Sequence, residues 1–190
     1  MSTVAPARIS EPMRRTTLDT LRVAPMAGDR RRGRLIAGTL VLPCALGRAG
    51  PTRVKREGDG ASPVGRFRLR GGYFRADRLA RPRCGLGLRA ARRDDGWCDD
   101  PQDRRYNRPV ALPCEGVSCE RLWREDGLYD AVIDLDWNRG PIRPGRGSAI
   151  FLHVARPGFL PTEGCVALRR RDLMRLLPRL GPRTVLVLSG

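Results

Sequence analysis

A histidine and a cysteine stand close together in this chain of 190 residues. His153 is the only histidine, and Cys165 follows it by twelve positions, directly after Gly164. A thiol acts as a nucleophile at neutral pH only when a base, or a lowered pKa, generates the thiolate. If the chain performs cysteine–histidine chemistry, His153 is therefore the general base for Cys165.

The residues beside Cys165 favour that chemistry. Gly164 has no Cβ, so a reacting carbonyl can approach the backbone, and the N–H groups of Gly164 and Cys165 can form an oxyanion hole. The alternative is a buried strand histidine and a structural cysteine, because free cysteine mostly behaves as a small hydrophobic residue. The context Thr-Glu-Gly-Cys-Val at residues 162–166 favours the catalytic interpretation.

Two motifs resemble those of the L,D-transpeptidase catalytic-domain family. His153, a loop, and then Thr162-Glu163-Gly164-Cys165-Val166 are similar to the family's histidine, loop and Ser/Thr-His-Gly-Cys-hydrophobic motif. Residues 60–67, Gly-Ala-Ser-Pro-Val-Gly-Arg-Phe, are similar to its Thr/Ser-Pro-x-Gly-x-Phe element. The motifs occur in the family's order, and the resemblance covers roughly residues 34–188.

Three features depart from the family's usual pattern. Glu163 stands where the family usually has a second histidine, and Ala167 stands where it often has Arg or Asn. The loop between His153 and Cys165 is also shorter than is common. These departures indicate a divergent branch whose substrate recognition differs, while the nucleophile and base are retained.

The resemblance implies a fold and a reaction. The fold is a mostly β, sandwich-like domain with mixed sheets and one or two short helices. In the reaction, His153 takes the proton of Cys165, and the thiolate attacks an L,D peptide bond of a peptidoglycan stem peptide to give a thioester. An amine of a second stem then forms the crosslink, and no cofactor or metal is implied. If water attacks instead, the enzyme is an L,D-carboxypeptidase or another cysteine hydrolase.

Further residues are candidates for binding the substrate: Thr162, Glu163, Arg146, Trp97 and Tyr106. An arginine, Arg146 or alternatively Arg48, would hold the stem-peptide carboxylate. The aromatic rings would stack on sugar or peptide, although simple packing would explain them equally well. The group that orients His153 stays open between a backbone carbonyl, Thr162 and an aspartate.

The chain is strongly basic, with 37 Lys and Arg against 20 Asp and Glu and a net charge of +17. Such a charge attracts nucleic acid, anionic lipid or anionic cell-wall polymer. Lys55 is the only lysine, however, and this arginine skew favours a solvated surface. The competing hypothesis from another class is a non-catalytic arginine-rich binder of an anionic polymer. The enzyme hypothesis predicts peptidoglycan stem peptides as partners and no nucleic acid.

The composition divides the chain into two parts. Residues 1–33 predict a basic flexible N-terminal tail, because no apolar period lasts long enough to bury a face. Residues 34–190 are expected to form the catalytic domain, as a monomer. Within it, residues 74–129 are polar and turn-rich, and their aromatic residues predict an ordered insertion that walls the active site.

Apolar runs predict strands at residues 35–42, 131–135, 148–153 and 184–188, and helical spacing predicts a helix over 172–177. The run at 35–42 could instead be the apolar region of a signal peptide. No run approaches 18 apolar residues, so no membrane span is expected. The resemblance implies a location in the periplasm or cell envelope, although no clear signal peptide is visible.

The six cysteines contain no Cys-x-x-Cys pair, which argues against a zinc ribbon. Cys114 with Cys119, and Cys84 with Cys98, are candidate disulfides. The aspartates at residues 94–100 do not match a calcium-loop spacing, so no metal site is predicted.

Overall fold

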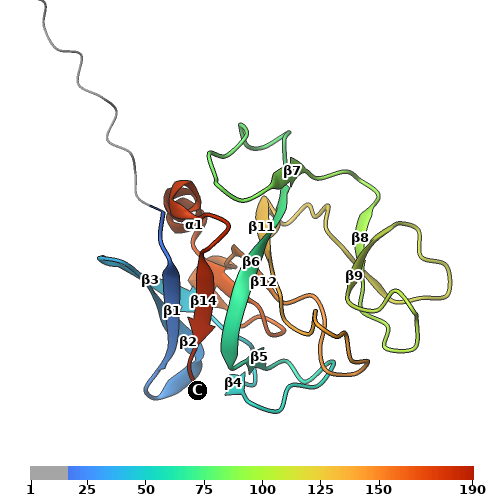
Figure 1. Cartoon of the computed structure of the whole chain (residues 1–190), viewed down its shortest axis with the longest axis horizontal. Coiled ribbons are helices and arrows are strands. Elements are labelled where there is room, and N and C mark those ends of the chain that lie inside the picture. The colour runs from blue at the N-terminus through green and yellow to red at the C-terminus, as the bar shows by residue number, and fades with distance from the viewer. Residues whose placement is uncertain (1–16) are drawn as a thin grey trace, which may run out of the picture.

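The computed structural model describes residues 17–190 and is mostly β (Figure 1). The strands are β1 Thr20–Met26, β2 Asp29–Ala37, β3 Leu40–Ala45, β4 Pro51–Thr52, β5 Ser62–Pro63, β6 Gly65–Phe74, β7 Leu88–Ala90, β8 Asp95–Cys98, β9 Arg108–Ala111, β10 Cys119–Arg121, β11 Ala131–Leu135, β12 Phe151–Val154, β13 Val166–Leu168 and β14 Val185–Leu188. The helical elements of these residues are α1 Arg170–Leu176 and two 3-10 turns, η1 Pro157–Phe159 and η2 Leu177–Arg179. The predicted fold class, mostly β with few short helices, is confirmed.

The main sheet is nine-stranded and closes on itself. Its order is β11-β12-β13-β3-β2-β1-β14-β6-β7, and an additional pairing joins β11 to β6. All of these strands except β7 therefore form a ring. The pairs β1–β14, β12–β13 and β6–β7 are parallel and the others antiparallel, so the sheet is mixed as expected. Opposite parts of the one sheet face each other across a shared core.

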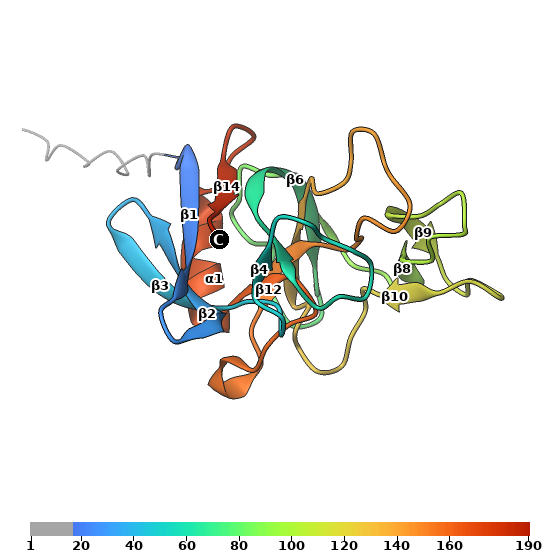
Figure 2. The ribbon, with the colours of Figure 1, turned by 90° about the horizontal axis from the view of Figure 1, so that it is seen from below.

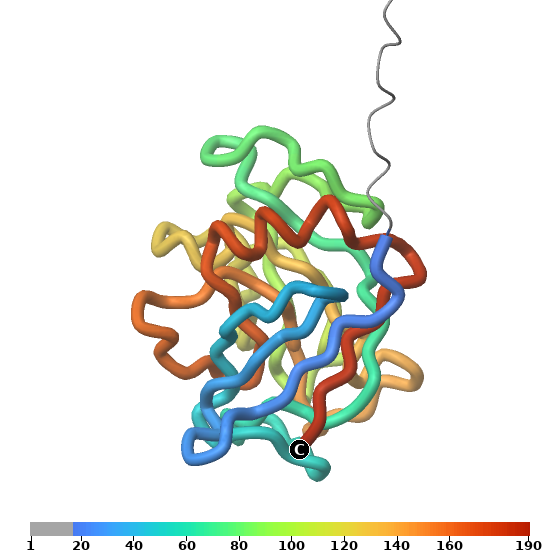
Figure 3. Tube along the Cα trace, turned by 90° about the vertical axis from the view of Figure 1, so that its left-hand side faces the viewer, coloured from blue at the N-terminus to red at the C-terminus, as the bar shows by residue number. Residues whose placement is uncertain are grey.

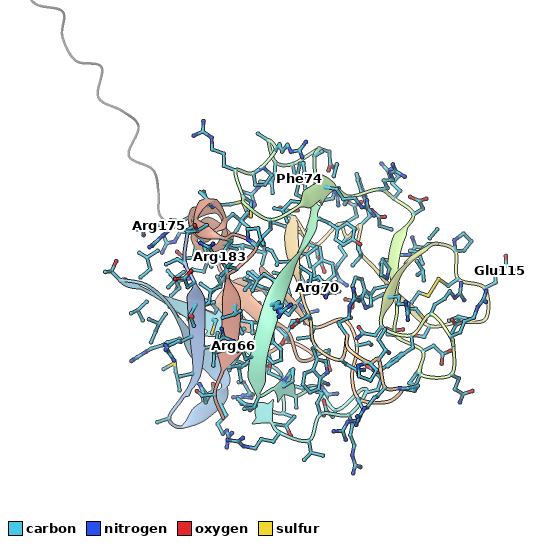
Figure 4. All side chains as sticks on the ribbon, viewed as in Figure 1. Arg66, Arg70, Phe74, Glu115, Arg175 and Arg183 are labelled. Atoms are coloured by element: carbon cyan, nitrogen blue, oxygen red, sulfur yellow. A yellow bond between two sulfur atoms is a disulfide. The ribbon has the colours of Figure 1, made fainter. Side chains whose placement is uncertain are left out.

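Alternation along the strands fills this core. On β6, Phe67 and Leu69 point inward, while Arg66 and Arg70 are exposed and lie along the strand in Figure 4. Every strand of the ring contributes apolar side chains to the same cluster, and α1 adds Leu173 and Leu176. Successive side chains on a strand point to opposite faces, so each ring strand has an inner apolar face and an outer face that is free for other roles.

The 74–129 segment extends away from the ring. Figure 2 shows β8, β9 and β10 on the side opposite β1, β2 and β3. They form a separate three-stranded sheet in the order β10-β8-β9. Trp97 and Leu122 of this segment pack with Phe151 of β12 in a second apolar cluster. The segment therefore covers the outer face of β12.

The predicted N-terminal tail is wrong for residues 20–33, because β1 and β2 are integral strands of the ring. β1 pairs with β2 on one side and runs parallel to β14 on the other (Figure 3). Leu21 and Val23 are buried, while Arg22 and Ala24 point outward and are exposed. Residues 1–16 of the predicted tail lie outside the described residues.

A substitution on β1 tests whether this strand is part of the folded domain. Leu21 is fully buried, so Leu21→Ala is expected to lower the free energy of unfolding by about 2–5 kcal/mol. Arg22→Ala, on the exposed face of the same strand, serves as the matched control and is expected to change it by less than about 0.5 kcal/mol. Guanidinium denaturation measures both, and equal, wild-type stability of the two variants would contradict the position of β1.

The single strand predicted at residues 35–42 is also wrong. This run is a hairpin in which β2 ends at Ala37 and β3 begins at Leu40, with Ala37 paired to Leu40. Gly38 has φ +64°, a conformation that glycine adopts without strain in a two-residue hairpin turn. Leu35 and Leu42 are buried in the core, while Ile36 and Val41 on the other face of the hairpin are exposed.

The other element predictions agree with the structure. Strand β11 spans the predicted 131–135, β12 and β14 lie within the predicted 148–153 and 184–188 to within one residue, and α1 overlaps 172–177. The predicted Cys114–Cys119 disulfide is present. It lies near Glu115, at the edge of the molecule opposite β1 (Figure 4). Cys84 and Cys98 are free, so that pairing was wrong. No helix within residues 17–190 is long and apolar enough to cross a membrane.

Candidate active site

The pairing of β12 with β13 puts His153 and Cys165 on one face of the sheet. The strands are parallel, with His153 opposite Ala167, and Cys165 lies two residues before Ala167. Side chains two residues apart share a face, so Cys165 and His153 do as well. Their neighbours Leu152 and Val166 point the other way into the core. The short parallel pair therefore delivers the two residues to the outer face, where the 74–129 segment covers it.

Both side chains line a cavity of about 340 Å³. The 74–129 segment supplies one wall, and the loops around residues 57–58, 148–149 and 156–163 supply the rest. Six carboxylate or guanidinium side chains line it besides the pair, four of them acidic: Glu57, Asp99, Glu120, Glu163, Arg124 and Arg156. On a chain with a net charge of +17, this is a locally acidic cavity.

Cys165 is held by two backbone groups. Its thiol donates a hydrogen bond to the Ala149 carbonyl at 3.2 Å, and the Phe151 N–H donates to its sulfur at 3.3 Å. The residue is only 7% exposed, and this burial raises the pKa of the thiol to about 12. The negative charge of Glu120 adds to the rise. At neutral pH the sulfur is therefore protonated.

A backbone carbonyl orients His153, one of the alternatives that the sequence left open. Nδ1 lies 2.8 Å from the carbonyl oxygen of Val154, so Nδ1 carries the proton and Nε2 carries the free lone pair. The edge of the ring packs against Tyr129, with the centroids 5.2 Å apart. Burial lowers the pKa of His153 to about 4. The imidazole is therefore neutral at pH 7 and able to accept a proton at Nε2.

The buried imidazole makes the protein less stable in acid. Because the pKa of His153 is about 4 when folded and near 6.5 when unfolded, the unfolded chain binds the proton first as the pH falls. Above pH 6.5 the histidine is neutral in both states and does not lower the free energy of unfolding. Between pH 6.5 and pH 4 the free energy of unfolding falls by about 3 kcal/mol. Denaturation midpoints of wild type and His153→Gln at pH 7.5 and 4.5 measure this loss.

The comparison with His153→Gln is needed because protonation of another buried group changes the stability in the opposite direction. Burial raises the pKa of Asp134 to about 6, so its protonation favours the folded state over the same range. Only the difference between wild type and His153→Gln isolates the histidine. An identical loss of stability in both proteins would contradict a neutral buried His153.

Thr162 closes the turn before the nucleophile. Its hydroxyl donates to the carbonyl of Cys165 at 2.7 Å and accepts the N–H of Gly164 at 3.2 Å. The side chain lines the cavity, but both hydrogen bonds are internal. Of the two N–H groups predicted for the oxyanion hole, that of Gly164 is thus already engaged by Thr162.

Gly164 has a structural reason for lacking a Cβ. Its φ is +136°, and a Cβ there would lie 2.7 Å from the carbonyl oxygen of Ala61. From its sequence context, this glycine was expected to let a substrate carbonyl approach the backbone. The close neighbour is instead the backbone of the Ser-Pro-x-Gly-x-Phe element, so the two motifs contact each other at this glycine.

Glu163 and Arg48 form an ion pair at the rim of the cavity. Arg48 Nε lies 2.8 Å from Glu163 Oε2, and the Glu163 side chain is 74% exposed. Arg48 also donates to the carbonyl of Gly58, which lines the cavity. Arg48 thus contacts two residues that line the cavity.

Three residues predicted to bind substrate do not line the cavity. Trp97 and Tyr106 are each 2% exposed: the indole N–H donates to Asn107 at 3.1 Å, and the phenol bonds to Glu57. The side chain of Arg146 is exposed outside the cavity, and its carbonyl accepts the Trp137 N–H. The burial of Trp97 and Tyr106 favours packing, the alternative that the sequence left open, and makes their predicted stacking role wrong, whereas the carboxylate-binding role of Arg146 stays a prediction.

Sequence reasoning missed other residues of the cavity wall. Tyr129 donates a hydrogen bond to Glu120, and burial raises the pKa of that carboxyl. Arg124 lies over the ring of Tyr129, 5.2 Å from its centroid. No spacing signal marks these residues, because they come from separate parts of the 74–129 segment and line one cavity with Cys165 only in the folded chain.

Comparison with known proteins agrees with the motifs. The family model YkuD, L,D-transpeptidase catalytic domain, matches residues 29–188. The chain therefore belongs to the L,D-transpeptidase catalytic-domain family, as the resemblance predicted.

Among solved structures, L,D-transpeptidase 1 of Mycobacterium tuberculosis is similar, with 10% identity and a TM-score of 0.40. That match covers 90% of this chain and 62% of the other, so the chain spans less than two thirds of that protein. No curated protein matches the sequence.

Proposed function

We propose that the chain is a peptidoglycan L,D-transpeptidase that uses Cys165 as nucleophile and His153 as general base. The observation that carries the proposal is that these two side chains share one face and one cavity in a chain of this family. Nε2 of His153 is the free ring nitrogen, as a base requires. The proposed location is the cell envelope, where the substrate lies.

The neutral state of both groups determines how the first step proceeds. A thiol with a pKa near 12 does not exist as a stable thiolate beside His153. The proton therefore moves from the sulfur to Nε2 as the sulfur bonds to the carbonyl carbon, which is general-base catalysis. The N–H of Cys165 is the proposed donor to the oxyanion.

The second half of the reaction reverses these roles. The tetrahedral intermediate collapses to a thioester, and the imidazolium returns its proton to the departing D-amino acid amine. The acceptor amine then attacks the thioester, passes its proton to His153, and the thiol leaves protonated as the new amide forms. The carboxylates that line the cavity suit an amine-bearing acceptor, since they attract its ammonium form.

Defined disaccharide–tetrapeptide muropeptides test the proposal. Purified protein is incubated with them, and the products are resolved by mass spectrometry. A crosslinked dimer with loss of the terminal D-amino acid is the expected result, and its fragmentation identifies the stem positions that are joined. Shortened monomers alone would assign the L,D-carboxypeptidase reaction, and unchanged muropeptides with any stem would overturn the proposal in favour of an anionic-polymer binder.

A further inference from the structure

A strained residue touches the thiol. Ala149 has φ +51°, a left-handed conformation that residues with a Cβ seldom adopt. Its carbonyl oxygen accepts the hydrogen bond of the Cys165 thiol. Such strain persists only where the surroundings hold the residue in place, and it concentrates at functional sites.

Asn107, from the loop between β8 and β9, is what holds Ala149. Its Oδ1 accepts the N–H of Ala149 at 3.2 Å and the indole N–H of Trp97 at 3.1 Å. Its Nδ2 donates to the carbonyls of Trp137 and Asn138 at 3.0 and 3.1 Å. Two donors on one side and two acceptors on the other fix the orientation of the amide.

Asn107 is itself fixed in place. It is 2% exposed, its N–H donates to the carbonyl of Cys98, and its own carbonyl accepts Arg139. A side chain with every hydrogen-bonding group engaged in a buried site has one available geometry. The position of the Ala149 backbone is therefore set by the 74–129 segment.

We propose that Asn107 is a positioning residue for the nucleophile: by holding Ala149 left-handed, it fixes the carbonyl that aligns the thiol of Cys165. This inference rests on the proposed function for its catalytic consequence. In the resting site the proton of the thiol points to Ala149, and it passes to Nε2 of His153 when the sulfur attacks. The 74–129 segment thus takes part in catalysis through Asn107, although neither Trp97 nor Tyr106 lines the cavity.

Alkylation of Cys165 by iodoacetamide across a range of pH, followed on the peptide that contains it, tests the inference without a substrate. The hydrogen bond to Ala149 stabilises the protonated thiol, so Asn107→Ala is expected to lower the apparent pKa of Cys165 by about one pH unit. The charged groups that act on the thiol, Glu120, Glu163 and Lys55, are unchanged in this variant. With muropeptides, kcat should fall about tenfold while KM stays within about twofold.

Asn138→Ala is the matched control. Asn138 is also left-handed, with φ +53°, and its side chain likewise bonds to backbone groups, of Arg143 and Gly147. None of these bonds reaches Ala149, so this variant should keep the wild-type alkylation profile. Equal shifts in Asn107→Ala and Asn138→Ala would overturn the inference, because a general loosening of the loops would then explain both.

Asn107→Asp keeps the test decisive if Asn107→Ala does not fold. A carboxylate still accepts the Ala149 N–H but cannot donate to Trp137 or Asn138, so the apparent pKa should stay at or above the wild-type value. A lowered pKa in this variant would also overturn the inference. A shifted profile in Asn107→Ala without any acyl transfer would uphold the positioning role and refute only the proposed function.

Discussion

Replacing Cys165 with Ala is expected to abolish the proposed thioester adduct, and replacing His153 with Gln is expected to slow its formation by about 10²–10⁴-fold. Alanine has no nucleophilic atom, whereas the glutamine variant retains the thiol and lacks only the proton acceptor. Because burial holds the pKa of Cys165 near 12, the thiol has no other route to a thiolate at neutral pH. Both variants should therefore form less thioester than wild type, with none in Cys165→Ala and a slow reaction in His153→Gln.

Intact-mass time courses with a tetrapeptide donor measure both rates. Cys98→Ala is the control, because Cys98 is a buried free cysteine that does not line the cavity, and it should acylate at the wild-type rate. An adduct on Cys165→Ala would assign the nucleophile elsewhere. A wild-type rate in His153→Gln would remove the histidine from the mechanism.

That His153 and Cys165 lie together could be predicted from the sequence because the signal is local. A histidine at the end of an apolar run and a Gly-Cys pair before another apolar run place both residues on adjacent short strands. The apolar, β-branched run of β11 was equally clear. The neutral state of the pair could not be predicted, since it comes from burial by the distant 74–129 segment.

The wrong predictions for β1 and Trp97 share a cause: the sequence signal at these residues is ambiguous without the folded neighbours. β1 buries only Leu21 and Val23, since its other apolar residues are exposed or half-buried, and two buried positions are too few to indicate a strand without its neighbours β2 and β14. Trp97 was assigned to the substrate because an aromatic residue in a polar segment can face either water or a core. Only the folded chain shows that it packs edge-on against Phe151, with the centroids 5.1 Å apart.

The second large effect is expected at Gly164, where the two family motifs meet. Gly164→Ala places a Cβ 2.7 Å from the Ala61 carbonyl, and it forces a residue with a side chain to adopt φ +136°. Neither backbone segment can move away easily. Ser62, next to Ala61, accepts the Gly47 N–H with its hydroxyl at 2.9 Å, and Gly47 forms a β-bridge with Thr162, two residues before Gly164. We expect a loss of about 3 kcal/mol or more in the free energy of unfolding.

The same substitution should reduce acylation by at least about tenfold in the protein that remains folded, because the strain is relieved only by moving the Cys165 backbone. Gly158→Ala is the matched control: Gly158 has φ +71° in η1, but its Cβ would have no neighbour within 4 Å. It should therefore lose only about 1 kcal/mol, from the left-handed backbone alone, and keep its activity. Equal losses of stability in the two variants would show that backbone conformation alone, and not contact with Ala61, requires glycine before the nucleophile. A larger loss in Gly164→Ala, together with slower acylation, is the expected result, because φ +136° and the Ala61 carbonyl both act against a Cβ at the residue directly before Cys165.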